Sequence, residues 1–138
     1  MEHARSTAKL STCTRALKYG GIGAVIVVDG REVAQGYAGS MRGDDHCTDV
    51  GCSIDEKTSG CDRTVHAEMN AVLNAAYHGV RVEGGTLYCT ASPCWACFRA
   101  LRNAGITAVY YAEEYRLGVE RQKEYAKKFA IVFAQMEG

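Results

Sequence analysis

Two short stretches of the sequence carry residues whose types and spacing suit metal chemistry, HAE at 66–68 and PCWAC at 93–97. Cys94 and Cys97 stand three residues apart where a helix is expected to begin, so both sulfur atoms face one side, near the positive end of the helix dipole. Such a position lowers the pKa of a thiol and favours the thiolate, the form that binds zinc. His66 can supply a third ligand, and three protein ligands leave one tetrahedral position for water, as in catalytic zinc sites.

Glu68 stands two residues after His66, where its carboxylate can lie beside the open position without binding the metal. Bound zinc lowers the pKa of a water molecule from about 16 toward roughly 7, and Glu68 would take that proton and pass it on. Taken alone, C-x-x-C also occurs in redox motifs and structural half-sites, and H-x-E arises by chance. H-x-E followed by P-C-x-x-C is the signature of zinc-dependent nucleobase deaminases, so the combination predicts a deaminase with one catalytic Zn²⁺.

The elements that must position these residues follow from the hydrophobic pattern. Residues 22–28 predict a buried strand, and a tight-turn signal leads into a second strand over 32–38, which completes an antiparallel hairpin. Residues 39–62 are polar and show no helical or strand period, so they predict a long irregular segment. Residues 65–77 predict a helix whose buried stripe consists of Val65, Met69, Val72, Leu73 and Ala76.

The second half of the chain predicts alternating strands and helices. A strand over 86–90 precedes a helix that Ser92 caps, Pro93 begins and Gly105 ends. The remaining expected elements are a strand at 107–113, a helix at 118–129 and a strand at 130–135. With a helix before the first strand, this order predicts an α/β fold in which helices cover a mixed sheet.

Composition narrows the class of protein. A chain of 138 residues, 47% hydrophobic and 23% charged, suits one globular domain over 1–138. Its 16 basic residues balance 16 acidic ones, so nucleic acid and anionic membranes are not expected partners. No secretory signal or membrane span is evident, and we expect a cytoplasmic protein. In a reducing cytosol, its seven cysteines are better explained as metal ligands, catalytic groups or buried apolar residues than as disulfides.

Six motifs in order, STCTR, GAVIV, GYAGS, HCTDVGC, RTVHAEMNA and EGGTLYCTASPCWAC, resemble those of bacterial and phage deoxycytidylate (dCMP) deaminases of the cytidine deaminase superfamily. The resemblance runs from about Ser11 to Tyr115. It implies a three-layer α/β/α sandwich with a five-stranded mixed sheet, and hydrolysis of a cytosine amino group to a uracil carbonyl, with dCMP as the expected substrate. It also implies a homo-oligomer, often a hexamer, with dCTP and dTTP as possible effectors.

The resemblance also assigns substrate-binding roles to individual residues. The main-chain groups of Ala67 and Ser92, beside the metal ligands, are candidates to hold the edge of the base. Tyr115 stands where the family commonly has a tyrosine near the sugar or phosphate, although it can also simply end a strand. Tyr37, in the GYAGS motif, is a further substrate-binding candidate.

Two departures from the family fall on sugar and phosphate recognition. Ala38 replaces an asparagine that reaches the nucleoside, and Tyr77 with His78 replaces a Lys or Arg that can bind a phosphate. One explanation is that dCMP is still bound through Tyr115, Arg42 or main-chain amides. Another is a different cytosine substrate, such as dCTP, a free nucleoside or a nucleoside of secondary metabolism. Loss of activity is a third, which the complete set of zinc ligands disfavours.

The remaining cysteines suggest a second metal site. Four thiols suffice for a closed tetrahedral zinc, and a metal can order a long irregular segment. Relatives with the same motifs hold a second, structural zinc, so we predict as its ligands Cys13, Cys47, Cys52 and Cys61, with His46 as a substitute. Free thiols are the alternative, and Cys89 is expected to be a buried apolar residue. A noncatalytic zinc-binding module would also explain the sulfur, but it gives no reason for Glu68 beside His66.

Overall fold

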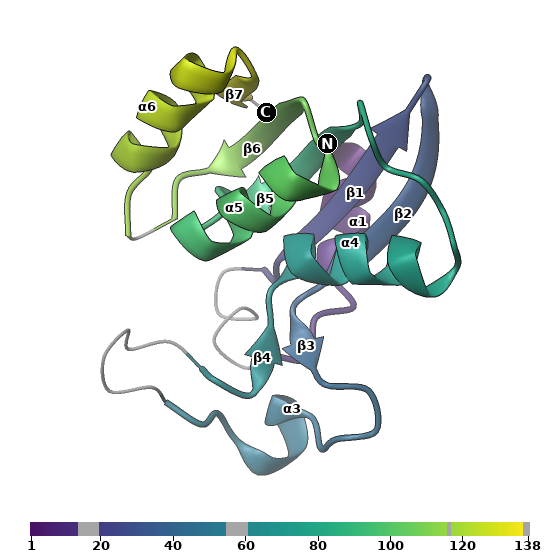
Figure 1. Cartoon of the computed structure of the whole chain (residues 1–138). Helices are drawn as coiled ribbons and strands as arrows, with labels where there is room; N and C mark the ends of the chain where they lie inside the picture. Colours follow the sequence, from purple (N-terminus) through teal and green to yellow (C-terminus); the bar gives the residue numbers. More distant parts are fainter. Residues whose placement is uncertain (14–19, 55–60, 116, 137–138) are drawn as a thin grey trace.

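The centre of the fold is a five-stranded mixed sheet in the order β2-β1-β5-β6-β7 (Figure 1). The computed structural model describes residues 1–13, 20–54, 61–115 and 117–136. β1 (Gly23–Val28) pairs antiparallel with β2 (Arg31–Tyr37) and with β5 (Thr86–Ala91). β5, β6 (Ala108–Glu113) and β7 (Val132–Gln135) are parallel. The prediction of a hairpin followed by crossover units is confirmed.

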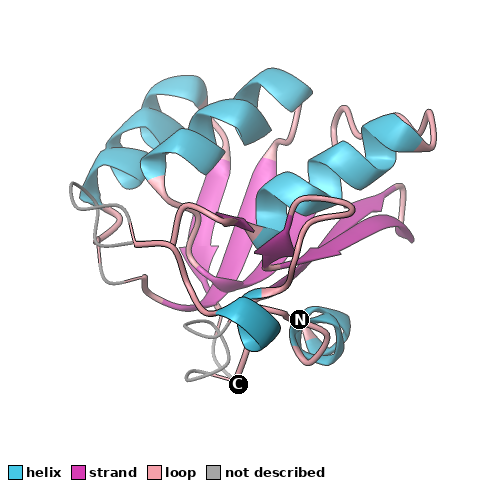
Figure 2. Cartoon of the chain, turned by 90° about the horizontal axis from the view of Figure 1, so that it is seen from below, coloured by secondary structure: helices cyan, strands magenta, loops and turns pink. Residues whose placement is uncertain are grey.

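Helices cover both faces of this sheet. α4 (Ala67–Tyr77), α5 (Trp95–Ala104) and α6 (Glu120–Phe129) lie on one face, and α1 (Glu2–Ala8) lies on the other, as Figure 2 shows. α5 connects β5 to β6 and α6 connects β6 to β7, so these two parallel crossovers put their helices on the same side. The expected α/β/α sandwich is confirmed. None of the helices in the described ranges is long and apolar enough to cross a membrane.

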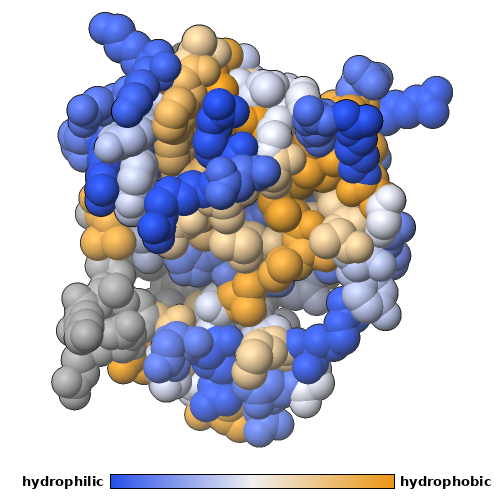
Figure 3. All heavy atoms as spheres, in the orientation of Figure 1, coloured by the Kyte–Doolittle hydropathy of each residue, from blue (hydrophilic) through white to orange (hydrophobic). Residues whose placement is uncertain are grey.

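The buried face of α4 differs from the predicted stripe. The side chains that face the sheet are Ala67, Ala71 and Ala75, whereas Leu73 is 50% exposed and Tyr77 is 69% exposed. Figure 3 shows apolar side chains gathered on the solvent side in this region. The helix lies so close to β2 that only small residues fit between them, which is why alanines replace larger apolar residues on the buried face.

The start of α5 also differs from the prediction. Cys94 is the N-cap residue and the helix begins at Trp95, so Ser92 is not the cap. The Ser92 hydroxyl instead accepts a hydrogen bond from the Tyr115 amide at 2.7 Å, which commits this side chain to the end of β6. The predicted end is confirmed, because Gly105 takes the left-handed conformation with a φ of 93°.

The segment predicted to be irregular contains short elements that lead into the catalytic motif. β3 (Gly39–Ser40) pairs antiparallel with β4 (Thr64–Val65), and between them lie α3 (Cys47–Val50) and an isolated bridge from Ile54 to Cys61. In Figure 1 this segment extends away from the sheet below α4. The pairing of Gly39 with Val65 brings the two ends of the segment together at the residue that precedes His66.

Candidate active site

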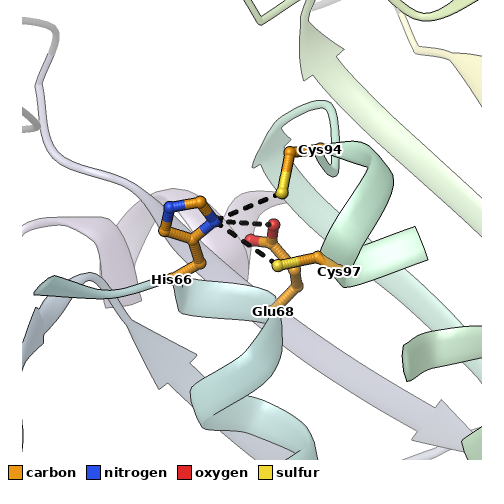
Figure 4. A group of neighbouring side chains, drawn as sticks. All are labelled: His66, Glu68, Cys94 and Cys97. Carbon is orange, nitrogen blue, oxygen red and sulfur yellow. Dashed lines mark hydrogen bonds and ion pairs between the residues drawn. The ribbon is translucent and has the colours of Figure 1, made fainter. Parts of the chain in front are cut away.

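The starts of two helices bring the predicted zinc ligands together. His66 is the N-cap residue of α4, Cys94 is the N-cap residue of α5, and Cys97 lies in the first turn of α5. The His66 Nδ1 atom lies 3.6 Å from the Cys94 Sγ atom and 3.4 Å from the Cys97 Sγ atom (Figure 4). With Glu68, their ligand atoms all lie within 4.8 Å of one another. The residues predicted as zinc ligands thus lie together, and their role as ligands stays a prediction.

These distances fit a tetrahedral zinc ion. Bond lengths of about 2.3 Å to sulfur and 2.0 Å to nitrogen, at tetrahedral angles, separate the two ligand atoms by roughly 3.5 Å. The observed separations of 3.4 and 3.6 Å match this value. Two sulfurs and one imidazole nitrogen are also the donor set of known catalytic zinc sites. His66, Cys94 and Cys97 can therefore hold Zn²⁺ with little movement.

Without a metal ion, shared protons hold the three predicted ligands together. The Cys97 thiol donates to Cys94, which lowers the pKa of Cys94 to about 4 and raises the pKa of Cys97. The hydrogen bond to Cys94 raises the pKa of His66 to about 9, because the thiolate stabilises the imidazolium form. A proton on Nδ1 of His66 thus faces the sulfur atoms, where a metal ion would lie.

Glu68 lies beside the ligands and away from solvent. Its side chain is buried, and burial raises the pKa of the carboxyl group. The Oε1 atom lies 3.9 Å from His66 Nδ1, and the Oε2 atom accepts a hydrogen bond from the Cys89 thiol at 3.7 Å. A buried carboxyl group with a raised pKa next to a metal site is suited to move protons.

A pocket of about 790 Å³ opens onto this group. His66, Glu68 and Cys94 line it, together with three of the predicted substrate-binding residues, Ala67, Ser92 and Tyr115. The Ser92 amide already donates to the Glu113 carbonyl at 2.9 Å, so that amide is not available to a base. Tyr37 stands at the end of β2, and the residue of this segment that lines the pocket is its neighbour Ala38.

Two basic residues that line the pocket were not predicted from the sequence. Arg5 and Lys9 lie at the end of α1 and line the same pocket as Glu68. Their spacing of four residues places them on one side of the helix, which is a signal that the sequence did contain. Arg42 takes a different position, with its guanidinium carbon 4.5 Å from the centre of the Tyr77 ring, and it is not among the lining residues. Thr14 and Arg15, the end of the STCTR motif, lie outside the described residues.

A second group of thiols forms where the sequence predicted a structural zinc. Ligand atoms of Cys13, Cys47 and Cys52 lie within 4.8 Å of one another, and the Cys61 Sγ atom lies 3.6 Å from the Cys47 Sγ atom. Zinc-bound sulfurs are roughly 3.8 Å apart. Burial raises the pKa of Cys61, but hydrogen bonds from Thr64 and from the main chain outweigh it and lower that pKa to about 6. Three of the four predicted cysteines thus form one group, and Cys61 joins it through its contact with Cys47. His46, the predicted substitute, is exposed at the start of α3.

The fold and this site together are those of zinc-dependent nucleobase deaminases: a mixed sheet whose covering helices begin with H-x-E and C-x-x-C. A family model described as "Cytidine and deoxycytidylate deaminase zinc-binding region" matches residues 1–113. The chain belongs to this family, and the family resemblance predicted from its motifs is confirmed.

Several relatives refine this assignment. The chain is 47% identical over 107 residues to ComE operon protein 2 of Bacillus subtilis, with 77% of this chain and 53% of that protein covered. It is 34% identical over 125 residues to deoxycytidylate deaminase of Mycobacterium phage D29, with 80% and 89% covered. The solved dCMP deaminase of cyanophage S-TIM5, in complex with dCMP and dUMP, superposes with a TM-score of 0.81 at 29% identity and covers 98% of this chain and 92% of that one. The chain spans about half the length of the Bacillus protein.

Proposed function

We propose that this protein is a zinc-dependent hydrolase that converts dCMP to dUMP and ammonia. The observation that carries the proposal is the buried carboxylate of Glu68 within 4.8 Å of the ligand atoms of His66, Cys94 and Cys97, in a pocket open to a small molecule. The similarity to a solved dCMP deaminase with dCMP and dUMP bound supports this choice of substrate.

The residues of the site have separate tasks in this reaction. His66, Cys94 and Cys97 would hold Zn²⁺, which acts as a Lewis acid and lowers the pKa of a water molecule at the open position. Glu68 takes one proton from the attacking water and delivers it to the ring nitrogen next to the reacting carbon. It then takes the second proton from the new hydroxyl group on that carbon and gives it to the leaving amino group, so that a carbonyl and ammonia form. The Ala67 amide, in the first turn of α4, has no partner within the helix and can orient the edge of the base.

The phosphate of dCMP needs cations, and the pocket offers Arg5 and Lys9. A volume of about 790 Å³ is sufficient for a nucleotide. Neither basic side chain has an ion-pair partner within the described residues, so both are available to an anion. Glu113 and Glu114 also line the pocket, and their charge disfavours an anion on that side. We therefore assign the phosphate to the α1 side of the pocket. There Arg5 and Lys9 would take over from the Lys or Arg of the family that Tyr77 with His78 replaces.

The proposal also includes features that rest on the family resemblance. Cys13, Cys47, Cys52 and Cys61 would hold a second, structural zinc. The close group of the first three thiols and the contact between Cys47 and Cys61 support this proposal. We further propose a cytoplasmic homo-oligomer, such as a hexamer, that responds to dCTP and dTTP.

Replacement of Glu68 by alanine tests the mechanism. The Glu68→Ala variant should keep its fold and its zinc content but lose ammonia release by about 10²–10⁴-fold, because the proton carrier is gone. Glu124→Gln, on the exposed surface of α6, is the matched control and should retain full activity. Unchanged turnover in Glu68→Ala would refute the mechanism.

A substrate panel tests the specificity. Ammonia release should be fastest with dCMP when dCTP, CMP, deoxycytidine, cytidine and cytosine are compared at equal concentration. A preference for a compound without phosphate would show that Ala38 and Tyr77 mark a changed substrate.

A further inference from the structure

Cys89 lies in β5 directly beside the catalytic carboxylate. It is completely buried, in register with Ala24 of β1 on one side and Tyr111 of β6 on the other. It belongs to the same buried cluster as Ala67 and Ala71 of α4, which agrees with its interpretation as an apolar core residue. Its Sγ atom, however, lies 3.7 Å from Oε2 of Glu68, within range of a hydrogen bond from a thiol.

The direction of this hydrogen bond follows from the surroundings. The Cys89 thiol is the donor and Oε2 of Glu68 is the acceptor, as the carboxylate form in which Glu68 acts as a base requires. Burial raises the pKa of Cys89 well above its usual value, which keeps the sulfur protonated. Cys94 and Cys97 lie in the same group around Glu68, but as zinc ligands they would be thiolates without a proton to donate. Within the described residues of this group, Cys89 is thus the thiol that can still donate to Glu68.

We infer that Cys89 is a positioning residue, which holds Oε2 of Glu68 by a hydrogen bond and thereby directs Oε1 toward His66 Nδ1 and the two ligand sulfurs. The terminal torsion of a glutamate side chain is broad, so a single anchored oxygen restricts the plane of the carboxylate. Oε1 lies 3.9 Å from His66 Nδ1, on the side where a bound zinc ion would activate water. The effect on catalysis rests on the proposed function.

Kinetics of the zinc-loaded full chain test this role. Cys89→Val keeps an apolar side chain at this buried position but removes the donor, and should lower kcat for dCMP about tenfold with KM unchanged. Cys89→Ser restores a donor and should recover kcat to within about threefold of the native enzyme, because a hydroxyl donates better than a thiol. Leu87→Val, two residues earlier in β5 and equally buried, is the matched packing control and should leave kcat unchanged. Equal kcat values for Cys89→Val and the native enzyme would overturn the inference.

Infrared spectroscopy tests the hydrogen bond without any turnover. The difference spectrum between the native protein and Cys89→Val isolates the S–H stretching band of Cys89. In a Glu68→Ala background the same difference should show this band at higher wavenumber, because the acceptor is gone. A band at the same position would refute the hydrogen bond. If the band moves but no cytosine compound is deaminated, the proposed function fails and the contact stands.

Discussion

The contact between α4 and β2 predicts that Gly36→Ala damages the active site from a distance. A Cβ atom on Gly36 would lie 2.8 Å from the carbonyl carbon of Asn70, and closer still to the Ala71 nitrogen and the Ala67 carbonyl oxygen. All three are main-chain atoms of the helix, so no side chain can rotate away. The helix must move off the strand.

The size of this movement sets the expected effect. An ordinary contact begins near 3.4 Å, so relief of the Asn70 contact alone needs a shift of about 0.6 Å, and the two closer contacts need about 1 Å. Overpacking of this kind costs about 1–3 kcal/mol, and we expect the upper end because only main chain can yield. His66 caps α4 and Glu68 lies in its first turn, so both move with the helix. Displacement of catalytic groups by about 1 Å lowers the rate by up to 10²-fold, and a loss of about ten- to a hundredfold in kcat is expected.

Urea unfolding and ammonia release on the same preparations measure both effects. Gly30→Ala is the control: Gly30 has a φ of +77° in the hairpin turn, but nothing lies within 4 Å of its added Cβ. That substitution should cost about 1 kcal/mol through backbone strain alone and leave kcat unchanged. A Gly36→Ala protein as stable and as active as Gly30→Ala would show that the helix does not lie this close to the strand.

Two further predictions concern the metal and the phosphate. Cys47→Ser should lower the zinc content from about two ions per chain to one and destabilise the protein, as elemental analysis and thermal unfolding would show; an equal zinc content would argue against the second site. Arg5→Ala and Lys9→Ala should each raise the KM for dCMP about tenfold and leave the KM for deoxycytidine unchanged, because a lost charge-assisted hydrogen bond costs about 1.5–3 kcal/mol. An equal effect on both substrates in steady-state assays would remove these residues from phosphate binding.

The catalytic group could be predicted from the sequence because each half of it is local. His66 with Glu68, and Cys94 with Cys97, are each fixed by the geometry of one helix start. Only the contact between these two pairs depends on the fold. The predicted alternation of strands and helices was sufficient to place the two helix starts together. The second group of thiols was predicted by elimination and resemblance.

The wrong or missing predictions concern residues whose surroundings depend on packing between distant parts of the chain. The buried stripe of α4 was predicted from its larger apolar residues. The main chain of α4 lies so close to Gly36 of β2, however, that only alanines fit on the buried face. Arg5 and Lys9 were missed because they reach the pocket from α1, on the opposite face of the sheet from α4 (Figure 2). Cys89 could not be distinguished from a core residue, since its role depends on one side chain of another element.

The chain between β3 and β4, which carries Cys47, Cys52 and Cys61, is connected to catalysis through the main chain that leads to His66. β4 ends at Val65, the residue before His66, and it is held to β3 by a ladder of two residue pairs. A two-stranded ladder is barely stable alone, and one this short needs support from elsewhere. Cys61 precedes β4 by three residues, and its sulfur lies 3.6 Å from that of Cys47 on α3. Metal binding by these thiols would therefore fix the approach to His66, so loss of the second site should weaken the first.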